Sequence, residues 1–134
     1  MEQTKDKAIG MLGLARRAGK LQTGEETVNA LLAEKKARLT VLASDAGEAV
    51  SRKVHSLAAG SRQQILQIPY DKLTLGQALG RPTVSVAAFA DVSMALAFVK
   101  ALPQGAAGAE LLAELERRVA RVKARRDSKT RKVK

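Results

Sequence analysis

The sequence predicts an α/β sandwich, and two patterns along the chain lead to this fold class. Short runs of apolar or alternating residues, of the length typical of strands, occupy 39–43, 64–68 and 84–89. Longer segments between them repeat apolar residues at helical spacing. Helices that alternate with short apolar strands cover a sheet, and we expect about four strands. A hydrophobic content of 46% in 134 residues is sufficient for one core.

Residues 4–18 predict the first helix, for which Thr4 is a candidate cap. Arg16 and Arg17 fall in its last turn, where cations oppose the negative end of the helix dipole. Gly19 follows, in a place where a glycine can adopt the left-handed conformation. The apolar residues of this segment share one face: Ala8, Ile9, Leu12 and Ala15. We therefore expect an amphipathic helix that ends at a basic corner.

A Thr-x-x-Glu capping box, Thr23 with Glu26, predicts the start of the second helix. Gly24 removes side-chain bulk beside N–H groups at the positive end of the helix dipole, which leaves room for a phosphate or a base edge. The strand that follows, 39–43, is continuously apolar, as in a strand buried on both faces. The start of this helix and the end of this strand should converge near three residues: Arg17, Lys20 and Gly24.

Polar residues predict the starts of three later helices. Ser44 or Asp45 can cap the third, Asp71 a short fourth one, and Asp91 a fifth. Residues that break helices or strands follow in order: Gly60, Pro69, Gly80 and Pro103. The segment Arg81–Thr83 then forms a loop before the last strand.

The C-terminal quarter has a different composition from the rest of the chain. PQGAAG at 103–108 predicts a hinge, so we divide the chain into a domain at 1–102 and an appendage at 103–134. The appendage begins with an amphipathic helix, whose apolar stripe comprises Leu112, Leu115, Val119 and Val122. This helix either packs back on the domain or stands out from it and folds on RNA. From 123 to 134 seven of twelve residues are basic and one is acidic, which predicts a basic tail that is disordered when free.

Charge and composition exclude several classes of function. The net charge of +11 and a pI near 10.5 favour polyanionic partners. Without cysteine, and with His55 as the sole histidine, we expect no disulfide and no metal site. No catalytic carboxylate pair or phosphate-binding loop motif is visible, so we expect no enzyme and no cofactor. Since no apolar run approaches ~18 residues and the N-terminus is too polar for a signal peptide, we expect no membrane association and a cytoplasmic protein.

Three blocks in order, GLARRAGKLQTGEETVNALL, LTVLASDA and LGQALGRPTVSVAAF, resemble the kink-turn-binding superfamily of large-subunit ribosomal proteins, especially its small bacterial members. The resemblance covers roughly residues 7–102. It implies a three-layer α/β/α sandwich with a roughly four-stranded mixed sheet, to which a C-terminal helix and a basic tail are added. It also implies that the chain grips structured RNA through the helix start at Gly24 and the loop from Arg81 to Val84.

The resemblance and the charges together give a set of candidate RNA-binding residues: Arg17, Lys20, Gly24, Glu25, Glu26, Thr27, Arg81, Pro82, Thr83 and Val84. Arg17 and Lys20 would anchor phosphate, and Val84 would press on an extruded base. Glu26 has two interpretations, a capping-box acid or an acceptor for cytosine or guanine amino groups. The expected partners are ribosomal or kink-turn-like RNA and also ribosomal proteins, and the expected state is a monomer.

The sequence departs from the family pattern at the helix start. Kink-turn readers of this superfamily carry Asn, Glu and Lys at the places of Glu26, Thr27 and Ala30. These changes motivate an alternative hypothesis, in which the chain is a ribosome-assembly or protein–protein adaptor that has lost kink-turn specificity. A third hypothesis is the substrate-binding half of an RNA-modifying enzyme, which would need a partner chain or a further domain.

Overall fold

The computed structural model describes residues 6–132, and side chains up to Ser128. Its sheet has four strands in the order β1-β4-β2-β3. They are β1 (Leu21–Thr23), β2 (Leu39–Leu42), β3 (Gln64–Gln67) and β4 (Val86–Phe89). β4 runs antiparallel to both of its neighbours, whereas β2 and β3 are parallel. The prediction of a mixed sheet with about four strands is therefore confirmed. β1 was not predicted, because three residues are too few to show an alternating pattern.

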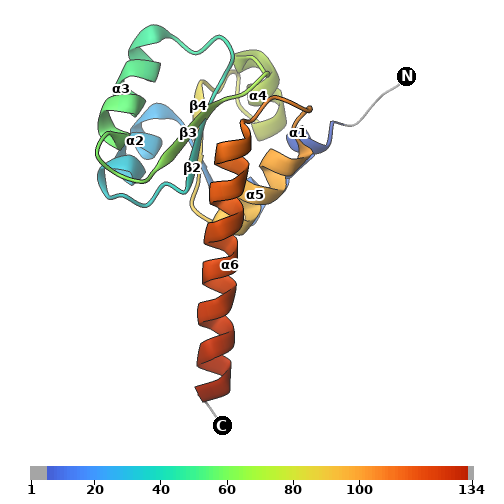
Figure 1. Cartoon of the computed structure of the whole chain (residues 1–134). Helices are drawn as coiled ribbons and strands as arrows, with labels where there is room; N and C mark the ends of the chain where they lie inside the picture. The colour runs from blue at the N-terminus through green and yellow to red at the C-terminus, as the bar shows by residue number, and fades with distance from the viewer. Residues whose placement is uncertain (1–5, 133–134) are drawn as a thin grey trace.

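Helices cover both faces of this sheet, which gives the predicted three layers (Figure 1). One face is covered by α1 (Lys7–Arg17), α4 (Lys72–Leu79) and α5 (Val92–Ala101). The other face is covered by α2 (Glu25–Ala33) and α3 (Glu48–Ala58). The chain ends with a long helix, α6 (Ala109–Lys132), which packs against α5.

β2 is buried on both faces, as its continuous apolar run predicted. Leu39 and Val41 belong to the core cluster on the side of α1, α4 and α5, whereas Leu42 belongs to the cluster beneath α2 and α3. The larger cluster also holds Phe89 and Phe98, whose ring centroids are 5.3 Å apart. Because successive side chains of a strand point to opposite faces of the sheet, β2 contributes residues to both core clusters.

The helix starts match the sequence only in part. Asp71 and Asp91 cap α4 and α5, accepting hydrogen bonds from Thr74 N and Met94 N at 2.8 and 2.9 Å, as predicted. The predicted cap of α3 is wrong, because Gly47 holds that position. Asp45 instead accepts from the backbone N–H of Lys72 at 2.8 Å, which ties the loop after β2 to the start of α4.

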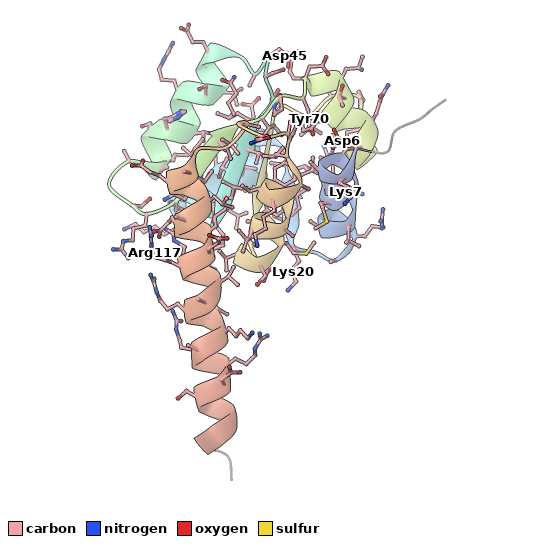
Figure 2. All side chains as sticks on the ribbon, turned by 45° about the vertical axis from the view of Figure 1, so that its right-hand side comes forward. Asp6, Lys7, Lys20, Asp45, Tyr70 and Arg117 are labelled. Carbon is pink, nitrogen blue, oxygen red and sulfur yellow. The ribbon has the colours of Figure 1, made fainter. Side chains whose placement is uncertain are left out.

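α1 begins at Lys7 with Asp6 as its cap, three residues later than predicted, and Thr4 lies outside the described residues. The other carboxylate oxygen of Asp6 accepts a 2.8 Å hydrogen bond from the Tyr70 hydroxyl (Figure 2). Burial and this carboxylate raise the pKa of Tyr70 above its usual value. The contact fastens the start of α1 to the segment between β3 and α4.

The two halves of α6 are placed differently, and both are helical. Leu115 is fully buried in the larger core cluster, so the first half of the helix packs on the domain. The second half extends beyond the sheet, as Figure 1 shows. The predicted disorder of 123–134 is wrong as far as Lys132, where α6 ends. A docked first half has already met the cost of helix nucleation, so adding further residues is favourable.

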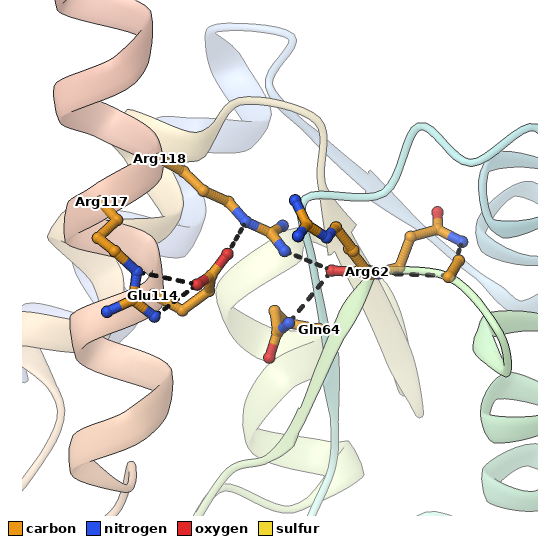
Figure 3. Close-up of polar contacts among 7 residues, drawn as sticks. Arg62, Gln64, Glu114, Arg117 and Arg118 are labelled. Atoms are coloured by element: carbon orange, nitrogen blue, oxygen red, sulfur yellow. Dashed lines mark hydrogen bonds and ion pairs between the residues drawn. The ribbon is translucent and has the colours of Figure 1, made fainter.

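Arginines on α6 help to attach it to the domain. Glu114 accepts hydrogen bonds of 2.6 Å from Arg117 Nη2 and from Arg118 Nε, and Arg118 Nη2 donates to the carbonyl of Arg62 at 2.6 Å (Figure 3). Hydrogen bonds from these guanidinium groups, of which the bond from Arg117 has the larger effect, lower the pKa of Glu114 from its usual 4.5 to about 2.

Among the described residues, none of the helices combines the length and apolar character that crossing a bilayer requires.

Thr40→Val should stabilise the fold. Thr40 is fully buried in β2, and its hydroxyl oxygen is one of two buried side-chain polar atoms in the described residues without a hydrogen-bond partner. Replacing the hydroxyl by a methyl group removes an unpaired polar group, so we expect a gain of ~1 kcal/mol in the free energy of unfolding. Thr40→Ser keeps the hydroxyl and loses the methyl, and it should destabilise. Urea denaturation of both variants measures this, and a destabilised Thr40→Val would show that the hydroxyl has a buried partner.

Glu114→Gln should remove a pH-dependent part of the stability. Because the folded pKa of Glu114 is about 2, against a usual value of 4.5, its contribution is complete above about pH 4.5 and is lost as the pH falls toward 2. The difference in unfolding free energy between wild type and variant should follow this course. Glu116→Gln is the control, since its pair with Lys100 is 3.8 Å long and half-exposed. A difference that does not vary with pH would contradict the assignment.

Candidate functional site

The start of α2 differs from the predicted capping box. Thr23 is the last residue of β1 and pairs with Ala87, so it cannot cap the helix, and the prediction of a Thr23–Glu26 box is wrong. Gly24 is the N-cap, and no side chain caps the helix. The backbone N–H of Gly24 donates to the carbonyl of Val86 at 3.1 Å. The pairing of β1 with β4 thus moves the helix start one residue further along the chain.

This arrangement leaves the tip of α2 open. The first N–H groups of a helix have no acceptor within the helix, and they carry the positive end of its dipole. Glu25, Glu26 and Thr27 in this first turn are exposed. A Cβ added at Gly24 would meet nothing within 4 Å, so no side chain or backbone atom crowds that side of Gly24. The tip can therefore donate hydrogen bonds to a phosphate or a carbonyl oxygen, while its two carboxylates accept from amino groups.

The loop before β4 lies at the same end of the sheet as this tip. β4 begins at Val86, whose carbonyl accepts the hydrogen bond from Gly24, so the loop that leads into β4 and the start of α2 share this end. Arg81, Pro82 and Thr83 are exposed. Val84 is only 3% exposed, and its backbone N–H donates to the carbonyl of Lys72 at 3.0 Å. The predicted contact between Val84 and an extruded base needs an exposed side chain, which this structure does not provide.

Gly76 supports this loop, and the sequence analysis missed it. A Cβ at this position of α4 would lie 2.6 Å from the carbonyl oxygens of Arg81 and Pro82, so only a glycine allows the loop to pack so closely. The backbone N–H of Arg81 donates to the carbonyl of Gly76 at 2.8 Å. An isolated glycine within a helical segment was the one local signal of this close approach.

Arg17 and Lys20 lie at the other end of the sheet. Lys20 precedes β1 and its carbonyl accepts from Ala90, whereas Gly24 follows β1. Four residues of extended chain, at ~3.3 Å each, separate the two by ~13 Å. Figure 2 shows Lys20 and Asp45, which follows β2, at opposite ends of the sandwich. The prediction that Arg17 and Lys20 meet the α2 tip is therefore wrong. The end of β2 does lie at the same end of the sheet as the tip, as predicted, because Leu42 pairs with Val86.

Arg17 is exposed and lines a shallow groove between α1 and α5, together with Lys7, Leu14 and Lys100.

His55 is also exposed, with Nδ1 2.8 Å from the carbonyl of Ser51. Within residues 6–132 we find no cluster of three or more His, Cys, Asp or Glu side chains that could hold a metal ion.

The fold belongs to a known class of proteins. Residues 6–97 match the model of the ribosomal protein L7Ae/L30e/S12e/Gadd45 family, and the chain belongs to this family. The matched region ends within α5 and does not include α6.

Individual relatives agree with this assignment. The chain is similar to the "RNA-binding protein YlxQ" of Enterococcus faecium, with 33% identity over 81 residues that span 60% of this chain and 78% of the relative. A protein of unknown function from Bacillus halodurans superimposes with a TM-score of 0.66 at 27% identity, over 72% of this chain and 97% of that one. The Giardia lamblia 15.5kD RNA binding protein has the same fold, with a TM-score of 0.55 at 15% identity, over 87% and 93% of the two chains.

Gly24→Ala should destabilise the protein, although there is space for the methyl group. The φ of 96° and ψ of 149° at Gly24 lie in a region that is accessible almost only to glycine, so we expect a loss of ~1–3 kcal/mol. Gly47→Ala is the matched control, because Gly47 also caps a helix but has an ordinary φ of −63°. Its stability should change by less than ~0.5 kcal/mol, since the cap preference and the chain entropy act in opposite directions. Thermal denaturation compares the two, and equal losses would mean that the conformation of Gly24 is not a constraint.

Proposed function

We propose that this chain is a non-catalytic RNA-binding protein that recognises structured RNA, kink-turn-like or ribosomal, with the α2 tip and the Arg81–Thr83 loop. One observation supports this above all: the hydrogen bond from Gly24 to Val86 joins the open tip to the strand that follows the loop with Arg81, so both lie at the same end of the sheet. Membership of the family, the RNA-binding name of the bacterial relative and the net charge of +11 agree with it.

The residues at this end of the sheet suit different parts of an RNA. Backbone N–H groups at the α2 tip can hold a phosphate, and the Arg81 guanidinium offers a planar fork for another. Glu25 and Glu26 can accept from cytosine amino or guanine imino and amino groups, which gives a way to read bases. Aromatic residues make up 2% of the chain, so recognition depends on shape, charge and base edges rather than on stacking.

The wider setting follows from the same function. We infer a cytoplasmic protein that acts as a monomer in association with the ribosome or with translation. The domain at 1–102 would hold the α2 tip, and the appendage at 103–134 would add cations. Arg17 and Lys20 would contact phosphates of the same RNA only where it extends along β1 to the opposite end of the sheet.

A second candidate function is a ribosome-assembly or protein–protein adaptor. The observation that favours it is the chemistry of the tip, where Glu26, Thr27 and Ala30 replace the Asn, Glu and Lys of kink-turn readers. Glu26 is exposed and negatively charged, and it repels phosphate unless it accepts from a base. An adaptor would bind RNA without preference for a kink-turn.

Arg81→Glu should weaken binding to a kink-turn RNA on the order of ten-fold, because it reverses the charge of a phosphate-binding side chain. Arg52→Glu is the control, since Arg52 is an exposed arginine of α3 and is not one of the candidate site residues. Fluorescence anisotropy with a kink-turn RNA, and with the same RNA carrying disrupted G·A pairs, measures both the affinity and the preference. Equal losses for the two variants would contradict the assigned site. Equal affinity for the two RNAs would favour the adaptor.

A further inference from the structure

A second basic surface lies at the end of the sheet opposite to the α2 tip. Five arginines and two valines line a groove of about 280 Å³ there. We call this hollow the arginine groove, and its arginines are Arg38, Arg62, Arg118, Arg121 and Arg125. Val92 and Val122 form its apolar part, and Val122 is 42% exposed. None of these arginines was a candidate site residue in the sequence analysis.

Three segments that are far apart in the sequence meet to build this groove. Arg38 precedes β2 and Arg62 precedes β3, and these parallel strands start side by side because Leu39 pairs with Gln64. Gln63 joins the two turns: its Oε1 accepts from Ala37 N and its Nε2 donates to the carbonyl of Leu32, both at 3.0 Å.

The third segment is α6, which is fixed against the turn before β3. Arg118 donates to the carbonyl of Arg62 at 2.6 Å and to Glu114 at 2.6 Å, as Figure 3 shows. Arg121 and Arg125 follow Arg118 at helical spacing. From Arg118 to Arg125 the helix rises ~10 Å.

The charges of the groove are not balanced from within the protein. No acidic residue lines it, and Arg118 is the one groove arginine that takes part in an ion pair within the described residues. The other four, Arg38, Arg62, Arg121 and Arg125, are exposed. Lys35 lies in the adjoining hollow and adds a further cation. Such a concentration of like charge repels itself in the free protein, and a polyanion relieves that repulsion.

We infer that the arginine groove binds the phosphates of an RNA segment distinct from the one held by the α2 tip. This inference rests on the proposed function. Guanidinium forks match phosphate oxygens in pairs, and the exposed Val122 between Arg121 and Arg125 can contact a ribose or a base. The two surfaces are separated by at least the length of β2, ~13 Å. An RNA that contacts both must therefore wrap around one edge of the sheet or bring two strands to it.

The test is the salt dependence of RNA binding by the full chain. The groove variant is Arg38→Gln, Arg121→Gln and Arg125→Gln, which leaves Arg118 in place to hold α6. The control variant is Lys7→Gln, Arg52→Gln and Lys53→Gln, which removes the same charge from α1 and α3. The probe is the kink-turn RNA with single-stranded extensions, titrated at several salt concentrations. Circular dichroism shows whether both variants keep the fold.

We expect the slope of log affinity against log salt to become shallower by ~2–3 in the groove variant, on the basis of ~0.7–0.9 for each phosphate contact. Its affinity should fall on the order of ten-fold or more at moderate salt, and the control should lose much less. Equal slopes in the two variants would overturn the inference, because overall charge would then explain the binding. Unchanged binding by the groove variant would overturn it too.

Two further arms separate this inference from others. The first arm measures how well a ligand protects the groove arginines from modification by phenylglyoxal, and it compares RNA with polyglutamate, which mimics an acidic protein. If polyglutamate protected them as well as RNA does, an acidic polypeptide would be the occupant and the inference would fail. The Arg81→Glu variant tests the α2 tip alone. If only Arg81→Glu loses RNA affinity, the proposed function stands and the inference about the arginine groove fails. If only the groove variant loses RNA affinity, the α2 tip is not the RNA site.

Discussion

The position of β4 between β1 and β2 is the constraint on which the rest of the structure depends. All four of its residues are buried, with Ala87 and Phe89 in one core cluster and Val86 and Ala88 in the other. Its antiparallel register with both neighbours decides which loops meet at each end of the sheet. At one end the Val86 carbonyl holds Gly24, and at the other the Phe89 carbonyl holds the backbone N–H of Arg38. A shift of one residue would exchange the buried faces and separate these pairs.

This register divides the polar surface into two chemically different ends. The α2 tip and the Arg81–Thr83 loop offer backbone donors, two carboxylates and one guanidinium. The opposite end gathers cations, with Lys20 beside β1 and the arginine groove beside β2, β3 and α6. Contacts to phosphate position a protein on a nucleic acid, whereas contacts to base edges select a sequence. The proposed division of labour places base reading at the first end and additional phosphate binding at the second.

α6 is what makes the second end so basic. The family match ends at residue 97, before this helix begins. Leu115 packs it into the core shared by α1, α4 and α5, and Glu114 orients Arg118 toward the carbonyl of Arg62. The helix thereby adds three arginines to the two that the sheet loops already supply. The same contacts support the rest of α6, which extends beyond the sheet (Figure 1).

The sequence by itself determined the features that repeat locally. The buried strand β2 and the aspartate caps of α4 and α5 were correctly predicted, because each depends on residues within one or two turns of chain. Only the tertiary structure decided the rest. Thr23 pairs within β1, Val84 is buried, and Asp45 binds the backbone N–H at the start of α4. Arg38, Arg62 and Arg121 line one groove. These outcomes depend on strand order and register, which link segments tens of residues apart and leave no periodic signal in the sequence.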